Sequence, residues 1–246
     1  MTGVQTCALP ISISSGTLVG SDTFTSLTYT YTSASPSYNS TTAPTAAGTY
    51  TITPSAANFT TGSASNYTIT YETATLTVSA TSQSTLTLTS TSGTYGTTLK
   101  LTTSGGSGTG AVSYSTSSAG CSITNTDSLT VTGAITCSVT ATKAADSNYN
   151  SASSSATNVV FATRSITITA ANKSATYTGS TVSVSNSYTI SSGTLVGSDT
   201  FTSLTYTYTS ASPSYSSTTA PTAAGTYTIT PSAASGTGSK IGRAHV

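Results

Sequence analysis

A segment of 45 residues occurs twice in this chain, at residues 13–57 and 190–234, and the two copies differ only where Asn39 corresponds to Ser216. The copies are offset by 177 residues, whereas solenoid proteins repeat every 20 to 50 residues or so. Each repeating unit therefore holds whole domains rather than one supersecondary element. The repeat predicts a tandem array of domains, the architecture of stalks and adhesive surfaces.

The two ends of the chain are related through their coding strands. Residues 241–246 and a stop codon, back-translated and read on the opposite strand, encode residues 5–11, QTCALPI. Folding does not explain an antisense relation, and both ends resemble translated adapters of sequencing libraries. We therefore expect residues 1–11 and 240–246 to be non-biological, unstructured and outside the fold. Cys7 and the single histidine, His245, lie in these segments.

The composition favours folded β-structure. Thr and Ser dominate the chain, and Tyr, with 15 residues, outnumbers the 4 Phe; Thr and Tyr are strand formers. Disordered chains usually carry a high net charge, but this chain has a net charge of +1 and only 4% charged residues. The scattered cations form no basic patch, which argues against nucleic acid as a partner. No apolar run is long enough for membrane insertion in this fragment.

Apolar residues alternate with Thr and Ser almost throughout the chain, which predicts strands. Gly, Ser, Asn and Pro clusters separate the runs and are typical of turns. The runs are marked by these residues: Leu27, Tyr29, Tyr31; Tyr67, Ile69, Tyr71; Ala74, Leu76, Val78; Leu86, Leu88; Leu99, Leu101; Val112, Tyr114; Leu129, Val131; Ile135, Val139; Ile166, Ile168; Val182, Val184. The predicted fold class is all-β, with tandem small immunoglobulin-like β-sandwich domains arranged as beads on a string.

Composition divides the chain into three pieces. Residues 12–80 and 163–239 share the repeated block and the phrase AAGTYTITPSAA, whereas residues 81–162 form a different unit. The outer pieces, with SGTLVGSDTF and SNYTITYETATLTVS, resemble the MBG domain of large bacterial surface proteins. The middle piece, with TYGTTLKLTTSGGSGTGAVSYSTSSAGCSI, resembles a bacterial immunoglobulin-like repeat. These resemblances imply a fold and an extracellular or cell-surface location, but no chemistry.

Neither MBG-like copy is whole. Residues 165–189 have no counterpart in the N-terminal piece, which lacks its first strands, and residues 66–79 have none in the C-terminal piece, which lacks its last. Loop closure favours local pairing of residues 66–79 over the distant block by about 2 kcal/mol. We therefore expect residues 66–79 to pair within 12–80, and residues 165–189 to pair within the C-terminal piece. Each copy then keeps an unfilled edge that can recruit a strand.

No residue pattern predicts an enzyme, so we expect no catalytic residue, cofactor or metal. The acids Asp22 and Asp199 are one position seen twice, in a Gly-Ser-Asp turn. Without a second acid nearby, neither forms a glycosidase pair. Asp146, with the asparagines that follow it, suggests a calcium loop, but no later acid completes the ligand set. We therefore favour a tight corner in which Tyr149 fills the core over a calcium loop.

Cys121 and Cys137 are the candidate disulfide. Cys121 is in phase with Ile123, and Cys137 with Val139, so both sulfurs face the core and can meet if their strands are neighbours. A bridge that closes a loop of about 16 residues contributes roughly 3 kcal/mol in the loop-entropy model. Export from the cell favours the bridge. Two buried free thiols remain the alternative.

Two functions fit these observations. The first is a structural or adhesive segment of a large bacterial surface or secreted protein, acting as a stalk or spacer. Its partners are neighbouring repeats, with weak contact to an extracellular glycan or matrix ligand. The alternative is direct binding of a polysaccharide or of ice by flat threonine-rich strand faces, suggested by the TYTYT and TITIT patterns.

Overall fold

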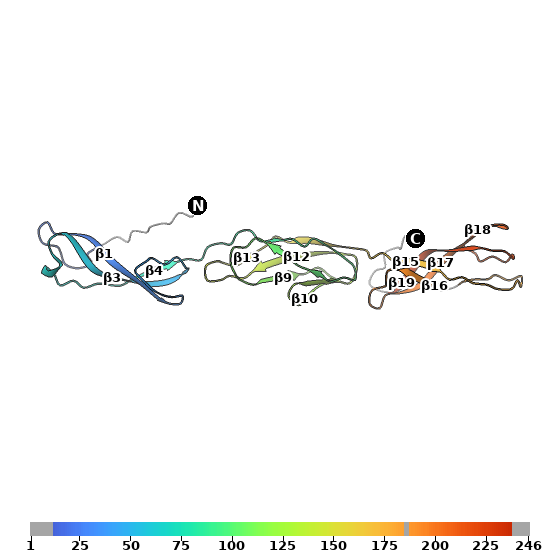
Figure 1. The fold of residues 1–246 in the computed structure, drawn as a ribbon, viewed down its shortest axis with the longest axis horizontal. Coiled ribbons are helices and arrows are strands. Elements are labelled where there is room, and N and C mark those ends of the chain that lie inside the picture. The colour runs from blue at the N-terminus through green and yellow to red at the C-terminus, as the bar shows by residue number, and fades with distance from the viewer. Residues whose placement is uncertain (1–11, 185–186, 238–246) are drawn as a thin grey trace. The chain divides into compact units, whose positions relative to one another are not determined.

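The structure is a computed structural model that describes residues 12–184 and 187–237. These residues are organised in β-strands (Figure 1), as the alternation predicts, and the described part contains no α-helix, only the 3-10 turn η1 (Ala64–Asn66). No helix long enough and apolar enough to cross a membrane occurs in it. The terminal segments 1–11 and 240–246, predicted to be unstructured, lie outside the described residues. The all-β fold class is confirmed.

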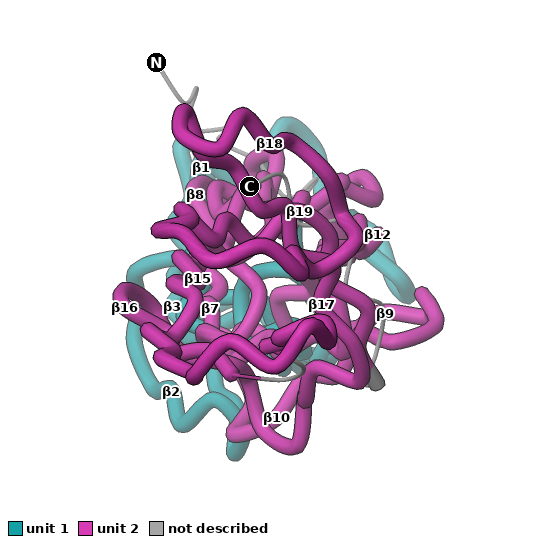
Figure 2. The backbone as a smooth tube through the Cα atoms, turned by 90° about the vertical axis from the view of Figure 1, so that its right-hand side faces the viewer, with its two compact units in different colours: residues 1–83, 107–109, 145–151 teal, residues 84–106, 110–144, 152–246 magenta. Residues whose placement is uncertain are grey.

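The described residues form two compact units (Figure 2). The first contains residues 12–83, 107–109 and 145–151, and the second contains residues 84–106, 110–144 and 152–237. A further division of the second unit near residue 163, which the composition suggests, stays a prediction.

The first unit is built on an antiparallel sheet with the strand order β2-β1-β3-β4. The strands are β1 (Thr23–Ala34), β2 (Ser37–Ser40), β3 (Gly48–Thr61) and β4 (Ala74–Val78). Tyr31 lies opposite Ile52, and Ile52 lies opposite Ala74. Because side chains alternate between the faces of a strand, Tyr31, Tyr50 and Ile52 are buried on one face and Thr residues cover the other.

Residues 67–73 differ from their prediction as a strand. They lie outside every strand, and only β4 follows, from Ala74. Their burial still alternates, with Tyr67, Ile69 and Tyr71 half-buried. The alternation therefore reports a buried face correctly, but a strand also needs a hydrogen-bonded neighbour. The local pairing of residues 66–79 is confirmed, because β4 pairs with β3 and the Tyr71 hydroxyl accepts a hydrogen bond from the Ala57 N–H at 2.9 Å.

In the second unit, one hydrophobic core is built from several small sheets. One sheet has the order β10-β11-β7, another β13-β12-β14-β6 with β9 also paired to β12, and β5 pairs with β8. Their bounds are β5 (Thr87–Leu88), β6 (Ser92–Thr94), β7 (Leu99–Lys100), β8 (Thr103–Ser104), β9 (Val112–Thr116), β10 (Cys121–Thr124), β11 (Ser128–Val131), β12 (Thr136–Lys143), β13 (Ala152–Ser153) and β14 (Thr157–Ala162). Leu129, Val139 and Val159 are fully buried where these strands meet.

The rest of the second unit holds the second copy of the repeated block. Strand β15 (Thr167–Ala170) pairs with β16 (Tyr188–Ser192), and another sheet has the order β18-β17-β19. Its strands are β17 (Thr200–Ala211), β18 (Ser214–Ser217) and β19 (Thr228–Thr237). Val184, Tyr206 and Tyr208 form the buried cluster. The expected pairing of residues 165–189 within the C-terminal piece is confirmed by β15 and β16.

Candidate functional site

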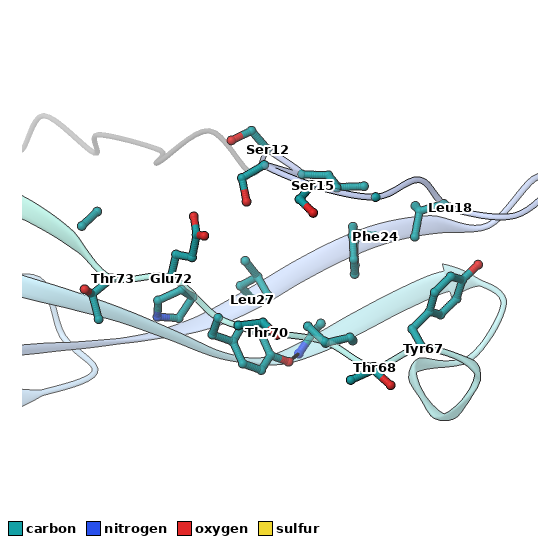
Figure 3. A pocket seen from close by; sticks show the side chains of 18 of the residues that line it. Ser12, Ser15, Leu18, Phe24, Leu27, Tyr67, Thr68, Thr70, Glu72 and Thr73 are labelled. Carbon is teal, nitrogen blue, oxygen red and sulfur yellow. Dashed lines mark hydrogen bonds between the residues drawn. The ribbon is translucent and has the colours of Figure 1, made fainter.

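A groove of about 560 Å³ lies in the first unit, lined largely by the first copy of the block, residues 13–57. Residues 12–18 form one rim and residues 67–74 the other, and side chains of β1 and β3 form the floor: Phe24, Leu27, Tyr29, Ile52, Pro54 and Ala57. Figure 3 shows Ser12 and Ser15 on one side, Thr68 and Thr70 on the other, and Phe24 and Leu27 between them. The volume falls in the range of ligand sites, which is roughly 300 to 1,000 Å³.

Both rims of the groove have strand-like sequences, but residues 12–18 and 67–73 lie outside the strands. Residues 12–15 precede β1, and their side chains, including that of Ile13 at 46% exposure, face solvent. Residues 67–73 precede β4 and keep the alternating burial of a strand. The groove thus offers main-chain hydrogen-bonding groups along its rims and an apolar floor.

Near one end of the groove, the lining residue Tyr67 (Figure 3) is hydrogen-bonded to an aspartate, Asp22. The Tyr67 hydroxyl donates to Asp22 Oδ2 at 2.6 Å and accepts from the Val19 N–H at 3.0 Å. The Tyr67 ring also stacks on Phe59, with ring centroids 5.4 Å apart. The hydrogen bond to Asp22 is the main reason why the pKa of Tyr67 is raised above its ordinary value. Because Asp22 holds this rim in place, the structure gives the acid a positioning role.

In the second copy, the same aspartate has a different partner. Asp199 Oδ2 accepts a hydrogen bond from the Tyr95 hydroxyl at 3.1 Å. Burial first, and this hydrogen bond second, raise the pKa of Tyr95. The turn that carries the acid is alike in both copies, since the Asp22 N–H donates to Val19 and the Asp199 N–H to Val196.

Asp146 closes a tight corner. Its Oδ2 accepts from the Thr109 N–H at 2.6 Å, and its Oδ1 accepts from the N–H groups of Asn148 and Tyr149 at 2.9 Å each. These bonds, that from Thr109 foremost, lower the pKa of Asp146 to about 2. Both carboxylate oxygens therefore accept hydrogen bonds from backbone N–H groups of this corner. Tyr149 was expected to fill the core, but it is half-buried, lies outside the buried cluster and bridges to Thr81.

The remaining acids stand at the surface. Glu72 is exposed on the rim of the groove. Asp127 forms an ion pair with Lys100 at 3.6 Å, with 34% and 77% of the two side chains exposed. Among the described residues, no group of three or more His, Cys, Asp or Glu side chains is placed to hold a metal.

Cys121 and Cys137 form a disulfide, with their Cα atoms 6.0 Å apart. The two cysteines were expected on neighbouring strands, but β10 and β12 belong to different sheets. Cys137 is fully buried and Cys121 is half-buried against the same core. The bond therefore links two sheets across the core. Alternation predicted the inward direction of both side chains but not which strands pair.

Comparison with known proteins finds a family similarity for the N-terminal part of the chain. Residues 3–77 match the family model of the MBG domain (YGX type), which is typical of repeats in large surface proteins and is generally non-catalytic. No curated protein and no solved structure matches the chain. The match confirms the MBG resemblance of the N-terminal piece. The immunoglobulin-like resemblance of residues 81–162 and the adapter origin of both ends stay predictions.

Proposed function

We propose that this chain is a stalk or spacer segment that bears tension in a large extracellular or cell-surface protein, in which neighbouring repeats are its main partners. The MBG match and the disulfide support an extracellular setting, since disulfides persist in oxidising compartments. The second copy reproduces 45 residues of the first with one substitution, which supports an array.

The observation that carries this proposal concerns the hydrophobic core between Leu86 and Phe161, which contains the disulfide. The first and last parts of this segment pair with each other. Strand β6, near its start, runs parallel to β14, at its end, with Val160 opposite Ser92. The Val160 N–H donates to Thr91, and the Tyr95 N–H donates to Ala162, both at 2.9 Å. Pulling on the two ends of this core moves parallel strands along each other. The hydrogen bonds are then loaded together instead of opening one after another.

Single-molecule stretching of the chain tests this function. Val160→Pro removes the N–H that donates to Thr91, whereas Val160→Thr keeps it, and the side chain is already 50% exposed. We expect the proline variant to unfold at a clearly lower force than the threonine variant. Equal forces would show that the parallel pair carries no load.

The disulfide identifies the unfolding step of this core in the same experiment, because it shortens the length of chain that the step releases. The bridge spans 16 residues and so withholds from the unfolded chain about 56 Å at roughly 3.5 Å per extended residue, less the 6.0 Å between the two Cα atoms. Reduction should add this length to the unfolding step of the core and leave the other steps unchanged. A step of unchanged length would mean that the recorded event is not the unfolding of this core.

The alternative function, polysaccharide or ice binding by a threonine face, has one supporting observation. Thr32, Thr51 and Thr75 lie in register across β1, β3 and β4, and Asn39 of β2 lies opposite Thr32. Strands in a sheet are about 4.8 Å apart, so these side chains form a regular polar row. Co-sedimentation with insoluble polysaccharide, and ice recrystallisation, test this role. Binding that survives Thr51→Glu would exclude the row as the site.

A further inference from the structure

The two copies of the block, residues 13–57 and 190–234, have nearly the same sequence but are packed against different strands. A surface that is buried in one copy and exposed in the other therefore marks a strand that one copy lacks. In the second copy, β15 pairs with β16, and Ile168 lies opposite Ile190. The counterpart of Ile190 in the first copy is Ile13, on the rim of the groove, where it is 46% exposed. Among the described residues, no strand pairs in the first copy with the rim that β15 covers in the second.

The floor of the groove shows the same difference. In the second copy, Ala170 of β15 packs against the cluster that contains Tyr206, and Tyr206 is 6% exposed. Its counterpart Tyr29 lines the groove and is only half-buried. Pro231 is likewise buried, whereas its counterpart Pro54 is half-buried at the groove. The apolar surface that the groove exposes is thus the surface that β15 buries in the second copy.

A pair of equivalent glycines locates the missing backbone. Gly193 of the second copy and Gly16 of the first have similar φ angles, +78° and +83°. A Cβ atom on Gly193 would lie 2.5 Å from the Ser165 carbonyl oxygen, just before β15, whereas one on Gly16 would meet nothing within 4 Å. The space beside Gly16 is therefore open where the start of the β15 segment passes in the second copy.

We propose that the groove of the first copy is an acceptor site for a β-strand, and that its occupant is the β15 segment, residues 165–171, of a second copy of this chain. The strand lies antiparallel to residues 12–15, with Ile168 opposite Ile13 as in the ladder of β15 and β16. Main-chain hydrogen bonds to the rims give affinity, and alternate side chains on the floor give register, as in other β-strand additions.

The chemistry of the donor fits the groove. Residues 165–171, SITITAA, carry no charge and alternate apolar with hydroxyl side chains, which suits an apolar floor between two polar rims. Residues 67–71 of the far rim already alternate in burial, and a β15 segment that docks here exchanges its ladder with β16 for an equivalent ladder with residues 12–15. An edge with unpaired N–H and C=O groups is a known template for an added strand.

Disulfide trapping with the full-length chain tests both the site and the register. The probe is a synthetic peptide of residues 165–173, SITITAANK, with Ile168→Cys, and the chain carries Cys7→Ser and Ile13→Cys. Directly opposite residues in an antiparallel pair lie at Cα separations that a disulfide can bridge. Under a glutathione redox buffer we expect cross-linking at Ile13→Cys to exceed that at Val19→Cys at least tenfold. Val19 is the matched control because it is 72% exposed, outside the predicted register.

Binding of the unmodified peptide gives a second readout. Ile13→Pro removes the backbone N–H and fixes φ at the centre of the proposed ladder. Ile13→Thr keeps the N–H and leaves φ free. Since Ile13 is exposed and outside every strand, neither variant should change the thermal unfolding of the free chain. We expect the proline variant to bind the labelled peptide at least tenfold more weakly than the threonine variant. Equal cross-linking at Ile13→Cys and Val19→Cys would overturn the proposal. Equal affinity of Ile13→Pro and Ile13→Thr for the peptide, or equal affinity of the chain for a scrambled peptide, would also overturn it. None of these results bears on the spacer function.

Discussion

Strand β3 of the first copy begins at Gly48, whereas β19 of the second copy begins at Thr228, the counterpart of Thr51. The sequence is the same, but the neighbours differ. Residues 48–52 pair with β4 in the first copy, whereas among the described residues of the second copy only β17 pairs with β19. A neighbouring strand therefore decides where this strand starts.

Other contacts are the same in both copies. Tyr38 and Tyr50 have ring centroids 5.5 Å apart, and their counterparts Tyr215 and Tyr227 are 5.6 Å apart. The Tyr38 and Tyr215 hydroxyls each donate to a carbonyl oxygen four residues ahead at 2.8 Å. The block thus sets its own hairpin, whereas burial and strand ends depend on what covers it.

The largest expected difference between the copies lies at one tyrosine. Tyr50 is fully buried beside β4, whereas its counterpart Tyr227 is half-buried. Tyr50→Ala should therefore lower the free energy of unfolding of its sheet by about 3–5 kcal/mol, as for large aromatic truncations, and Tyr227→Ala by clearly less. Hydrogen exchange measured on peptides that contain residue 39 or 216, where the copies differ in mass, reports each sheet separately. Equal losses would mean that β4 does not cover Tyr50 in solution.

A smaller difference is expected at the paired glycines. Gly16→Ala and Gly193→Ala both place a side chain at positive φ, so that both carry the same backbone cost. Only Gly193→Ala also drives a Cβ towards the Ser165 carbonyl, which should add about 1–3 kcal/mol of overpacking. Thermal unfolding of the two variants compares these costs directly. If Gly16→Ala were the more damaging, the space beside Gly16 would be occupied in the free chain.

Much of the fold could be predicted from alternation, because burial on one face is a local property of sequence. Tyr31 of β1 is buried, and Leu27 and Tyr29, four and two residues earlier along the strand, are half-buried at the floor of the groove. Pairing is less local, and two errors follow from it. Residues 67–73 alternate without a ladder, and Cys121 and Cys137 bridge two sheets instead of neighbouring strands. Each depends on partners that are distant in sequence.

The candidate site could be predicted only in outline. Comparing the copies indicates that opening strands lack a counterpart in the first, and hence that an edge is unfilled. The groove itself needs coordinates, because its floor is drawn from β1 and β3 and its far rim from residues 67–74. The Tyr67–Asp22 bond was also missed, since 45 residues separate the two side chains. The only signal in the sequence was that the aspartate occurs in both copies and the tyrosine in one.

The smallest expected difference concerns the ionisation of these tyrosines. Tyr67 has its pKa raised mainly by the hydrogen bond to Asp22, and Tyr95 mainly by burial. Asp22→Ala should therefore return the pKa of Tyr67 most of the way towards its ordinary value of about 10. Asp199→Ala should lower the pKa of Tyr95 by less. Titration of the tyrosine ring carbons by NMR, assigned with Tyr67→Phe and Tyr95→Phe, measures both.

The sign of the linked stability follows from the direction of these shifts. A folded-state pKa above the unfolded value means that the fold favours the neutral hydroxyl. The stabilisation is therefore complete below about pH 10 and is lost as the pH rises through the raised pKa. Asp22→Ala should remove this alkaline sensitivity at Tyr67 and leave the titration of Tyr95 unchanged, because Asp199 is the acid bonded to Tyr95. A Tyr67 pKa that stays raised in Asp22→Ala would show that burial, and not the hydrogen bond to the aspartate, is the main cause of the shift.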